Sequence, residues 1–309
     1  MEHKNLYNQV AQNKARVLAI GEILWDVFDD SSRLGGAPLN FSVNASRLGH
    51  DVILVSALGE DVLGNSALQT IQALGLDVRF VRTTARFPTG IAMVRTSPNG
   101  DATFHIHRPA AYDAVQLSEG DLQYLTRWAP GWLYYGTLFS STDSGLKALR
   151  NVIHTLPEMT RFYDVNLRPD SYSPELLLEL LDLADVVKLN AAEMEAVREL
   201  AGLPSGSIED FCRAGVALYG WKAVCVTMGA LGCAVLSGGS YARAEGCAVE
   251  VVDTVGAGDG FAAAFLHGLA QQWQPSEIGA FANRIGAMIA SHRGAIPDWN
   301  AGQIFDWAG

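Results

Sequence analysis

The sequence predicts an α/β fold in which a mostly parallel β-sheet is covered by helices on both faces. The main observation is that strand-like and helix-like segments alternate along most of the 309 residues, which is typical of βαβ units. A second observation is that two early helix-like segments end at a glycine, a common helix terminator. A third is one segment with the pattern of a β-hairpin, which predicts a small separate sheet.

The alternating elements can be followed from the N-terminus. After a polar lead-in at 1–14, the first four segments predict a strand, a helix, a strand and a helix, and they read "RVLAIGEILWDVF", "APLNFSVNASRLG", "DVILVSALG" and "GNSALQTIQALG". The alternation returns in "GWLYYGTL", "RFYDVNL", "ADVVKLN", "AAEMEAVRELAG" and "KAVCVTMG". Further along, "EVVD" predicts a strand end, "TVGAGD" a turn and "GFAAAFLHGLA" a helix. We find no fixed-period repeat and no low-complexity linker in the sequence.

The segment that breaks the alternation is "TGIAMVRTSPNGDATFHIHR", residues 89–108. Its two β-patterned arms flank the turn 98–101, and Asn-Gly between such arms is a strong hairpin signal. We expect the segments at about 26–36 and 87–108 to form a small lid or an oligomer contact outside the main sheet. The alternative is a hairpin that extends the main sheet.

Composition and charge narrow the class of protein. Apolar residues make up 49% of the chain, as in globular proteins, and the formal net charge is −11, which disfavours nonspecific nucleic-acid binding. No apolar run approaches the roughly 18 residues that span a bilayer, and the N-terminal segment lacks the apolar core of a secretory signal. The four cysteines lack CxxC spacing, which favours reduced core thiols. We therefore expect a cytoplasmic protein without nucleic-acid or membrane partners.

A glycine-rich turn within "VVDTVGAGDGFAAAFLHG" is the first candidate site. Free N–H groups at a helix start form an anion site, and Gly256 and Gly258 let the backbone approach an anion closely. The turn lacks the lysine of a P-loop and the GxGxxG spacing of a dinucleotide fold. Because Asp259 in the first helical turn would also stabilise the helix dipole, the turn alone leaves catalytic and structural interpretations open.

A second glycine motif, "RLGGAPLNFSVNASRLG", lies far earlier in the chain, at residues 33–49. Its Gly35-Gly36 pair allows close approach of the backbone to a ligand. Pro38 suits an early helical position, and Asn40 can project an amide near that helix start. The two motifs therefore offer polar groups at two helix starts.

Together, "GGAPLNFSVNASRLG" and "DTVGAGDGF" resemble the two signatures of the PfkB, or ribokinase-like, carbohydrate kinase family. Intermediate motifs match from about residue 17 to 297. The resemblance implies a ribokinase-like three-layer α/β/α sandwich with a small β-sheet lid, as one PfkB kinase domain over residues 1–309. It also implies transfer of the γ-phosphoryl group of ATP, with Mg²⁺, to a hydroxyl group of a sugar or nucleoside.

The resemblance assigns the central roles of this reaction to the glycine-rich turn. Asp259 corresponds to the catalytic base that accepts the hydroxyl proton, and Gly256, Ala257 and Gly258 correspond to a backbone anion hole for the transferring phosphate. The assignment suits phosphoryl transfer, which depends on alignment and charge stabilisation and gains from general-base assistance.

The resemblance also implies residues that bind ATP and metal ions. The nucleotide-binding candidates are Lys188, Asn190, Glu193, Thr227, Gly229, Gly232 and Asn283, and Glu193 would also bind Mg²⁺ through water. For Asn190, Glu193 and Asn283, polar positions on a helix surface are the alternative. A monovalent cation such as K⁺ is implied at Asp253, Val255, Ala290, Arg293 and Gly294. There, an aspartate that only caps the turn is the alternative.

The sugar is the least determined part of the prediction. The substrate-binding candidates are Asp26, Gly36, Asn40, Arg108, Asn166 and Arg168. The segments "GEILWD", "LGGAPLNFSVNASRLG" and "FHIHRPAAYD" resemble fructokinases most, and "DVNLR" also resembles 2-keto-3-deoxygluconate kinases. Fructose is therefore the predicted substrate, and ketodeoxygluconate is the alternative. A ribokinase, a nucleoside kinase and a non-catalytic sensor are further alternative hypotheses for the function. The resemblance further implies a homodimer formed through the lid.

Overall fold

The computed structural model of the chain describes residues 13–29, 31–96, 102–168, 171–300, 302 and 304. This part of the chain forms one sheet of nine strands and one of four. The turn 98–101 predicted for the hairpin lies outside the described residues, as does nearly all of the polar lead-in.

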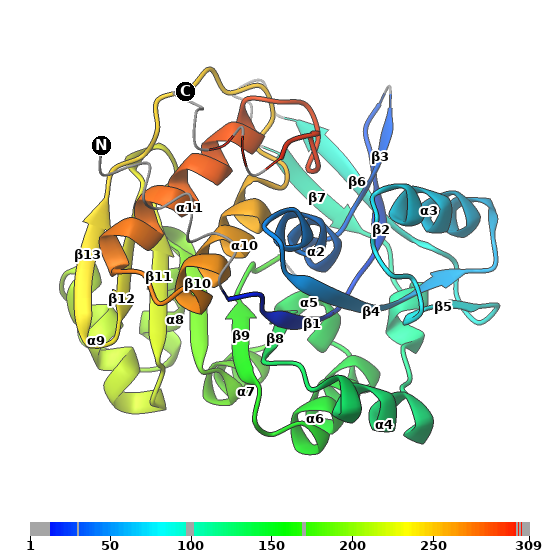
Figure 1. The fold of residues 1–309 in the computed structure, drawn as a ribbon, viewed down its shortest axis with the longest axis horizontal. Helices are drawn as coiled ribbons and strands as arrows, with labels where there is room; N and C mark the ends of the chain where they lie inside the picture. The colour runs from blue at the N-terminus through cyan, green and yellow to red at the C-terminus, as the bar shows by residue number, and fades with distance from the viewer. Residues whose placement is uncertain are drawn as a thin grey trace.

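The nine-stranded sheet forms the middle layer of the molecule (Figure 1). Its strands lie in the order β13-β12-β11-β10-β9-β8-β1-β4-β5. The pairs from β11 to β5 are parallel, and β12 and β13 add an antiparallel edge, so the prediction of a mostly parallel sheet is confirmed. The bounds are β1 Arg16–Ile20, β4 Asp51–Gly59, β5 Val81–Thr84, β8 Trp132–Gly136, β9 Thr160–Asp164, β10 Val186–Asn190, β11 Ala223–Thr227, β12 Cys233–Ser237 and β13 Ser240–Ala244.

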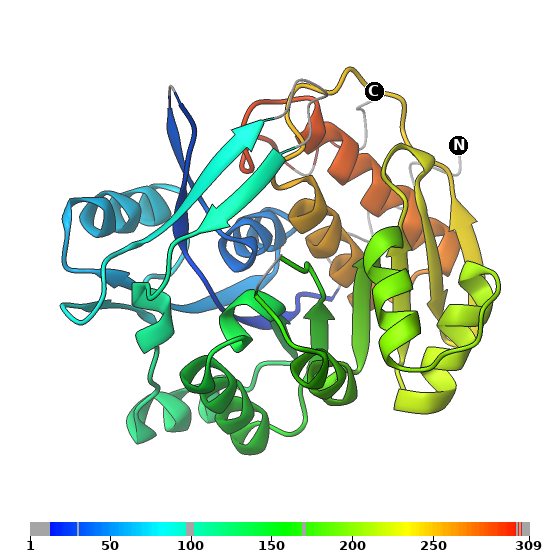
Figure 2. The same cartoon turned by 180° about the vertical axis from the view of Figure 1, so that it is seen from behind.

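Helices cover both faces of this sheet, which confirms the three-layer arrangement (Figures 1 and 2). One face carries α2 (Ala37–Arg47), α3 (Val62–Ala73), α10 (Ala257–Ala270) and α11 (Pro275–Ala290). The other carries α4 (Glu119–Trp128), α6 (Asp143–Thr155), α7 (Pro174–Leu183), α8 (Ala191–Leu200) and α9 (Ile208–Tyr219). Strands covered on both faces bury nearly every side chain, which explains continuous apolar runs such as that of β11.

The four-stranded sheet contains the predicted hairpin and stands apart from the main sheet (Figures 1 and 2). Its strands lie in the order β3-β2-β6-β7, with bounds β2 Leu24–Val27, β3 Ser32–Gly35, β6 Gly90–Thr96 and β7 Ala102–Ile106. The arms β6 and β7 pair antiparallel, and β2 pairs with β6 in parallel. The alternative of a hairpin that extends the main sheet is therefore wrong. This four-stranded sheet is called the small sheet below.

One predicted strand is divided between the two sheets. The segment "RVLAIGEILWDVF" contains both β1 and β2, which are separated by Gly21, Glu22 and Ile23. Gly21 has a φ of +156°, and a Cβ there would lie 2.5 Å from Pro38 Cγ. The close contact with α2 requires a glycine at this position, and there the chain leaves the main sheet.

The predicted strand end "EVVD" is wrong, because residues 245–252 form no strand in the structure. Val251 and Val252 are 59% and 50% exposed. The N–H groups of Val252 and Asp253 both donate to the carbonyl oxygen of Ala290, at 2.9 and 3.2 Å. The β-branched pattern is overruled because this segment lies against the end of α11 and pairs with no neighbouring strand.

Three of the four cysteines are buried, and all four are free thiols. In the described part of the chain, no helix is long and apolar enough to cross a membrane.

A pair of buried histidines connects the start of β1 to the C-terminal half of α10. The N–H of Ala15 donates to His50 Nδ1 at 3.1 Å, so neutral His50 carries its proton on Nε2 and donates it to His267 Nδ1 at 3.0 Å. His267 is fully buried against Trp273 and Phe281. Burial lowers the pKa of His50 to about 4 and that of His267 to about 3.

We predict that this pair makes the fold sensitive to acid. Because both pKa values lie below the ordinary 6.5, the unfolded chain binds more protons below that pH. Stability is therefore lost as the pH falls from about 6.5 toward 4, by on the order of 1–2 kcal/mol per histidine. Urea unfolding at pH 7.5 and pH 5 measures the loss. His50→Phe combined with His267→Leu should reduce the pH dependence, whereas His154→Gln on the surface of α6 should leave it unchanged. An equal loss in the double variant and the wild type contradicts the assignment.

Candidate active site

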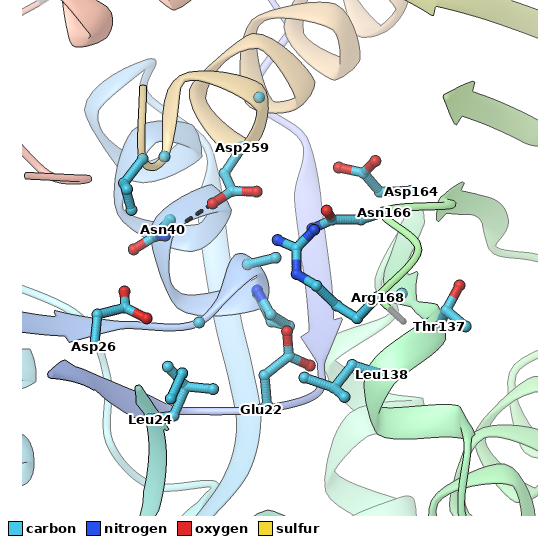
Figure 3. Close-up of a pocket in the computed structure, with 18 of the residues that line it drawn as sticks. Glu22, Leu24, Asp26, Asn40, Thr137, Leu138, Asp164, Asn166, Arg168 and Asp259 are labelled. Atoms are coloured by element: carbon cyan, nitrogen blue, oxygen red, sulfur yellow. Dashed lines mark hydrogen bonds between the residues drawn. The ribbon is translucent and has the colours of Figure 1, made fainter. Parts of the chain in front are cut away.

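A cavity of about 740 Å³ lies at the C-terminal ends of β1, β8 and β9, between the small sheet and the starts of α2 and α10. Figure 3 shows acidic, amide and guanidinium side chains directed into it from elements far apart in the chain. Its polar lining residues include Glu22, Asp26, Asn40, Thr137, Asp164, Asn166, Arg168, Thr254 and Asp259. This space is called the main cavity below. Ligands of open α/β sheets bind in the same position, beyond the carboxyl ends of the strands.

The glycine-rich turn places the start of α10 at the wall of the main cavity. Gly256 is the N-cap residue with a φ of +81°, and a Cβ there would lie 2.4 Å from the Cβ of Ala295. Gly256 and Gly258 line the cavity, but Ala257 does not. The N–H of Ala257 donates to the Thr254 carbonyl oxygen at 3.3 Å. Two of the three residues predicted for the anion hole therefore face the cavity.

Asp259 lies in the first turn of α10 and is 9% exposed. The amide of Asn40 donates to its carboxylate Oδ2 at 2.8 Å, as Figure 3 shows. Burial raises the pKa of Asp259 to about 6, although the hydrogen bond from Asn40 acts in the opposite direction. A carboxylate with this pKa is suited to accept a proton near neutral pH.

Two further carboxyl groups face the same space, Asp26 on β2 and Glu22 in the segment between the sheets. Burial raises the pKa of each to about 7, and the charge of Asp259 adds to both shifts. Asp26 is a predicted substrate contact, whereas Glu22 has no predicted role, and its one signal is that it is a single acid inside the apolar run "AIGEIL". A Cβ at Gly36 would lie 2.4 Å from the carbonyl oxygen of Glu22. Gly36, a predicted sugar contact, must therefore be glycine for a steric reason as well.

Asp164, at the end of β9, is the second acidic residue without a predicted role, although it is the first residue of the motif "DVNLR". It is 1% exposed and accepts hydrogen bonds from Lys188 Nζ at 2.8 Å and Tyr134 Oη at 3.0 Å. Burial lowers the pKa of Lys188, but the charge and hydrogen bond of Asp164 more than offset this effect. A Cβ at Gly258 would lie 3.8 Å from Lys188 Nζ, which places the ammonium group beside the start of α10.

The remaining substrate-binding candidates divide between two places. Asn166 and Arg168 line the main cavity, and Figure 3 shows the Arg168 guanidinium among the carboxyl groups. Arg108 does not line it, and its contact with substrate stays a prediction. It pairs with Asp113 at 2.5 Å and hydrogen-bonds to Ser141 beside a separate surface pocket.

Asn190 and Glu193 form a capping box at the start of α8. The Asn190 side chain accepts from the Glu193 N–H at 2.9 Å, and Glu193 Oε2 accepts from the Asn190 N–H at 2.8 Å. Glu193 Oε1 accepts from the N–H of Leu167 at 2.8 Å. Glu193 is 8% exposed, so the alternative of a solvated surface acid is wrong for this residue. Each carboxylate oxygen keeps a lone pair beyond its backbone hydrogen bond.

The other nucleotide-binding candidates lie around the end of β11, outside the lining of the main cavity. Thr227 pairs with Asn190 in the sheet register, and Gly229 begins the short helix η2 (Gly229–Leu231). A Cβ at Gly232 would lie 2.1 Å from the Ala244 carbonyl oxygen. Asn283 is 8% exposed and donates to the carbonyl oxygens of Ala244 and Glu245, at 3.1 and 2.9 Å. The alternative of a helix-surface amide is therefore wrong for Asn283.

The candidates for a monovalent cation site lie together behind the glycine-rich turn. Asp253 Oδ1 accepts from the Val255 N–H at 3.0 Å, and Asp253 Oδ2 accepts from the Gly294 N–H, also at 3.0 Å. Ala290 joins them through its carbonyl oxygen, which accepts from the Asp253 N–H. Asp253 thus caps this turn, as the structural alternative predicted.

Comparison with known proteins places this site in a family. The model of the "pfkB family carbohydrate kinase" matches residues 8–301. The Escherichia coli fructokinase is 28% identical over 91% of this chain and 95% of its own length, and a probable fructokinase-3 of Arabidopsis thaliana is 27% identical over 92% and 88%.

Solved structures agree with the sequence relatives. A Vibrio cholerae fructokinase described as bound to fructose, ADP and calcium ion has a TM-score of 0.81 at 25% identity, over 96% of this chain and 100% of that chain. A Xylella fastidiosa fructokinase with bound ATP has a TM-score of 0.79 at 20% identity, over 94% and 97%. Two glycine motifs that meet in one acidic cavity, a family model that matches nearly the whole chain and this ribokinase-like fold lead to one conclusion: the chain belongs to the pfkB family of carbohydrate kinases.

Proposed function

We propose that this carbohydrate kinase transfers the γ-phosphoryl group of ATP to a hydroxyl group of fructose, with Asp259 as the general base. The observation that carries the proposal is the buried Asp259 carboxylate, held by Asn40 at the start of α10 inside a cavity rich in hydrogen-bonding groups. Fructokinases among the relatives, and the fructose and ADP named for the Vibrio cholerae enzyme, support this substrate.

The chemistry follows from the position of Asp259 and α10. A sugar hydroxyl beside Asp259 gives up its proton to the carboxylate as the oxygen attacks the γ-phosphorus of ATP, and the bond from that phosphorus to the β,γ-bridging oxygen breaks and releases ADP. The general-base assistance is worth about 10²–10⁴-fold in rate. The positive end of the α10 dipole and the backbone at Gly256 and Gly258 stabilise the charge on the transferred group. Lys188, fixed by Asp164, adds a positive charge at the same end of the helix.

Mg²⁺ and ATP would bind on the side of the turn that faces β10 and β11. Glu193 fits a role through metal-bound water, because its two oxygens are oriented by backbone N–H groups and each keeps a lone pair. Bound there, Mg²⁺ would neutralise part of the negative charge of the phosphates. Thr227 and Gly229, at the end of the strand next to Asn190, would then contact the nucleotide.

The charge of the main cavity favours a neutral sugar over a sugar acid. Four of its lining residues are carboxylic acids, Glu22, Asp26, Asp164 and Asp259, whereas Arg168 is the one basic lining residue in the described part of the chain. Hydroxyl groups can donate to these acids, but a substrate carboxylate would be repelled by them. Arg168 is the observation that keeps ketodeoxygluconate as a second candidate, because a guanidinium binds a carboxylate well.

Dimerisation through the small sheet and a cytoplasmic location stay predictions. Met93 of β6 is 40% exposed on the small sheet, where an apolar contact with a second copy would cover it. Light scattering of the purified protein measures the number of subunits.

Asp259→Asn should remove the base while it preserves the shape of the side chain. We expect kcat to fall by about 10²-fold or more, with a melting temperature within a few degrees of the wild type. Asp143→Asn is the matched control, because Asp143 also lies in the first turn of a helix, α6, but outside the main cavity. If Asp259→Asn keeps near-wild-type turnover, Asp259 only stabilises the helix.

Asn40→Ala should shift the acid limb of the pH profile. Because the Asn40 amide donates to the charged form of Asp259, its loss raises the pKa of Asp259 above the wild-type value of about 6. We expect kcat/KM in the variant to decline at a higher pH than in the wild type as the solution is acidified. An acid limb that does not move would mean that Asp259 is not the titrating base.

A substrate panel tests the choice of sugar. Release of ADP is measured with fructose, ribose, ketodeoxygluconate and adenosine, and fructose should give the highest kcat/KM. Arg168→Met should lower turnover of ketodeoxygluconate more than turnover of fructose, because only the acid depends on the guanidinium charge. Fructose fails as the substrate if another compound is turned over and fructose is not. Binding of sugar without ADP release would favour a sensor.

A further inference from the structure

A guanidinium group lies against the carboxylate that precedes the glycine-rich turn. Arg33, on β3 of the small sheet, donates from Nη1 to Asp253 Oδ2 at 2.7 Å. Its side chain also lies over the ring of Phe28, with 4.9 Å between the guanidinium carbon and the ring centroid. A Cβ at Gly294 would lie 3.4 Å from Arg33 Cδ. The side chain is thus held on several sides, although it remains 34% exposed.

Two of the oxygens expected to bind a monovalent cation, Asp253 Oδ2 and the Ala290 carbonyl oxygen, each accept hydrogen bonds from two donors already. The Asp253 carboxylate accepts from Arg33 and from the N–H groups of Val255 and Gly294. The Ala290 carbonyl oxygen accepts from two N–H groups, at 2.9 and 3.2 Å. A cation such as K⁺ needs free oxygen lone pairs, and a fixed positive charge 2.7 Å from Oδ2 repels it. The residues present therefore do not fit a monovalent cation bound through Asp253 Oδ2 and the Ala290 carbonyl oxygen.

We propose that Arg33 takes the place of the monovalent cation, holding Asp253 and the turn 253–258 in position so that this kinase works without K⁺. Arg33 is then a positioning residue, because it contacts the carboxylate that caps the turn. The position of the turn determines where Gly256, Gly258 and Asp259 lie. The activity measurement below rests on the proposed function, whereas the binding measurement does not.

A permanent positive charge is needed at this point for an electrostatic reason. Asp253 is near enough to the main cavity for its charge to act on Asp26, and the charge of Arg33 acts on Asp26 in the opposite sense. An uncompensated Asp253 would add negative charge close to the site that receives phosphate. The guanidinium of Arg33 supplies this compensation through a direct hydrogen bond to the carboxylate.

The location of Arg33 on the small sheet gives a structural reason for an arginine in place of a bound ion. The side chain spans from β3 to a turn 220 positions later in the sequence. A bound ion would leave the small sheet and the turn unconnected at this point, whereas Arg33 links them directly. The same contact therefore neutralises Asp253 and fixes the turn relative to the sheet that carries Asp26.

The first test compares activity with and without K⁺. Wild-type enzyme, Arg33→Met and Arg33→Lys are assayed in potassium chloride and in tetramethylammonium chloride at equal ionic strength. The wild type should show the same kcat in both salts. Arg33→Met should lose about tenfold in tetramethylammonium chloride and recover in K⁺, a coupling of ordinary size between two sites, whereas Arg33→Lys should stay independent of K⁺. Arg82→Met, which breaks the exposed ion pair with Asp121, is the matched control and should behave as the wild type.

The second test measures cation binding without catalysis. Melting temperatures of the same proteins are recorded in the two salts with no nucleotide or sugar present. K⁺ should raise the melting temperature of Arg33→Met and leave those of the wild type and Arg33→Lys unchanged, because only a protein that binds the ion is stabilised by it. If the wild type is activated or stabilised specifically by K⁺, the proposal is overturned, whatever the variants do. It is also overturned if Arg33→Met responds to K⁺ no more than the wild type in both measurements.

Discussion

The hydrogen bond between Asn40 and Asp259 is the interaction on which the site depends. It joins the starts of α2 and α10, two helices whose bonded residues lie 219 positions apart in the sequence. The bond orients the carboxylate toward the cavity and favours its charged form against the effect of burial. Each helix start is in turn fixed by a glycine that no other residue could replace, Gly36 against Glu22 and Gly256 against Ala295. Close backbone packing at the two helix starts thus fixes the two residues that form this hydrogen bond.

The sequence predicted the parts of the fold and the site that are local or carried by a motif. Alternating segments gave the layers of the sheet, an Asn-Gly turn gave the hairpin, and two glycine motifs identified Asn40 and Asp259. Residues whose environment depends on distant contacts were not predictable in this way. Glu22 and Asp164 lie in the quoted segments "GEILWD" and "DVNLR". Their burial in one cavity with Asp259 appears only in the structure, where the ends of β1 and β9 and the start of α10 meet. The pairing of Arg33 with Asp253 likewise has no local signal.

Two segments with strand-forming residues differ from their predicted structure for a common reason. "EVVD" has strand-forming residues but no strand neighbour, and the segment from Arg16 to Phe28 has a continuous strand pattern but two separate sheets as partners. β-propensity describes fit to a pleated surface, and it does not say whether such a surface is present. At Gly21 the backbone conformation and the proximity of Pro38 decide where one strand must stop.

The crowding of acids in the main cavity has a consequence for evolution and engineering of the protein. Burial and mutual repulsion raise the pKa values of Glu22, Asp26 and Asp259, so keeping these groups ionised above neutral pH destabilises the fold. Selection for stability alone would replace them with amides or apolar residues, because activity and stability conflict at these positions. The cavity is thus a region where the chain is less stable than its architecture allows, and stabilising variants found there are expected to be poor kinases.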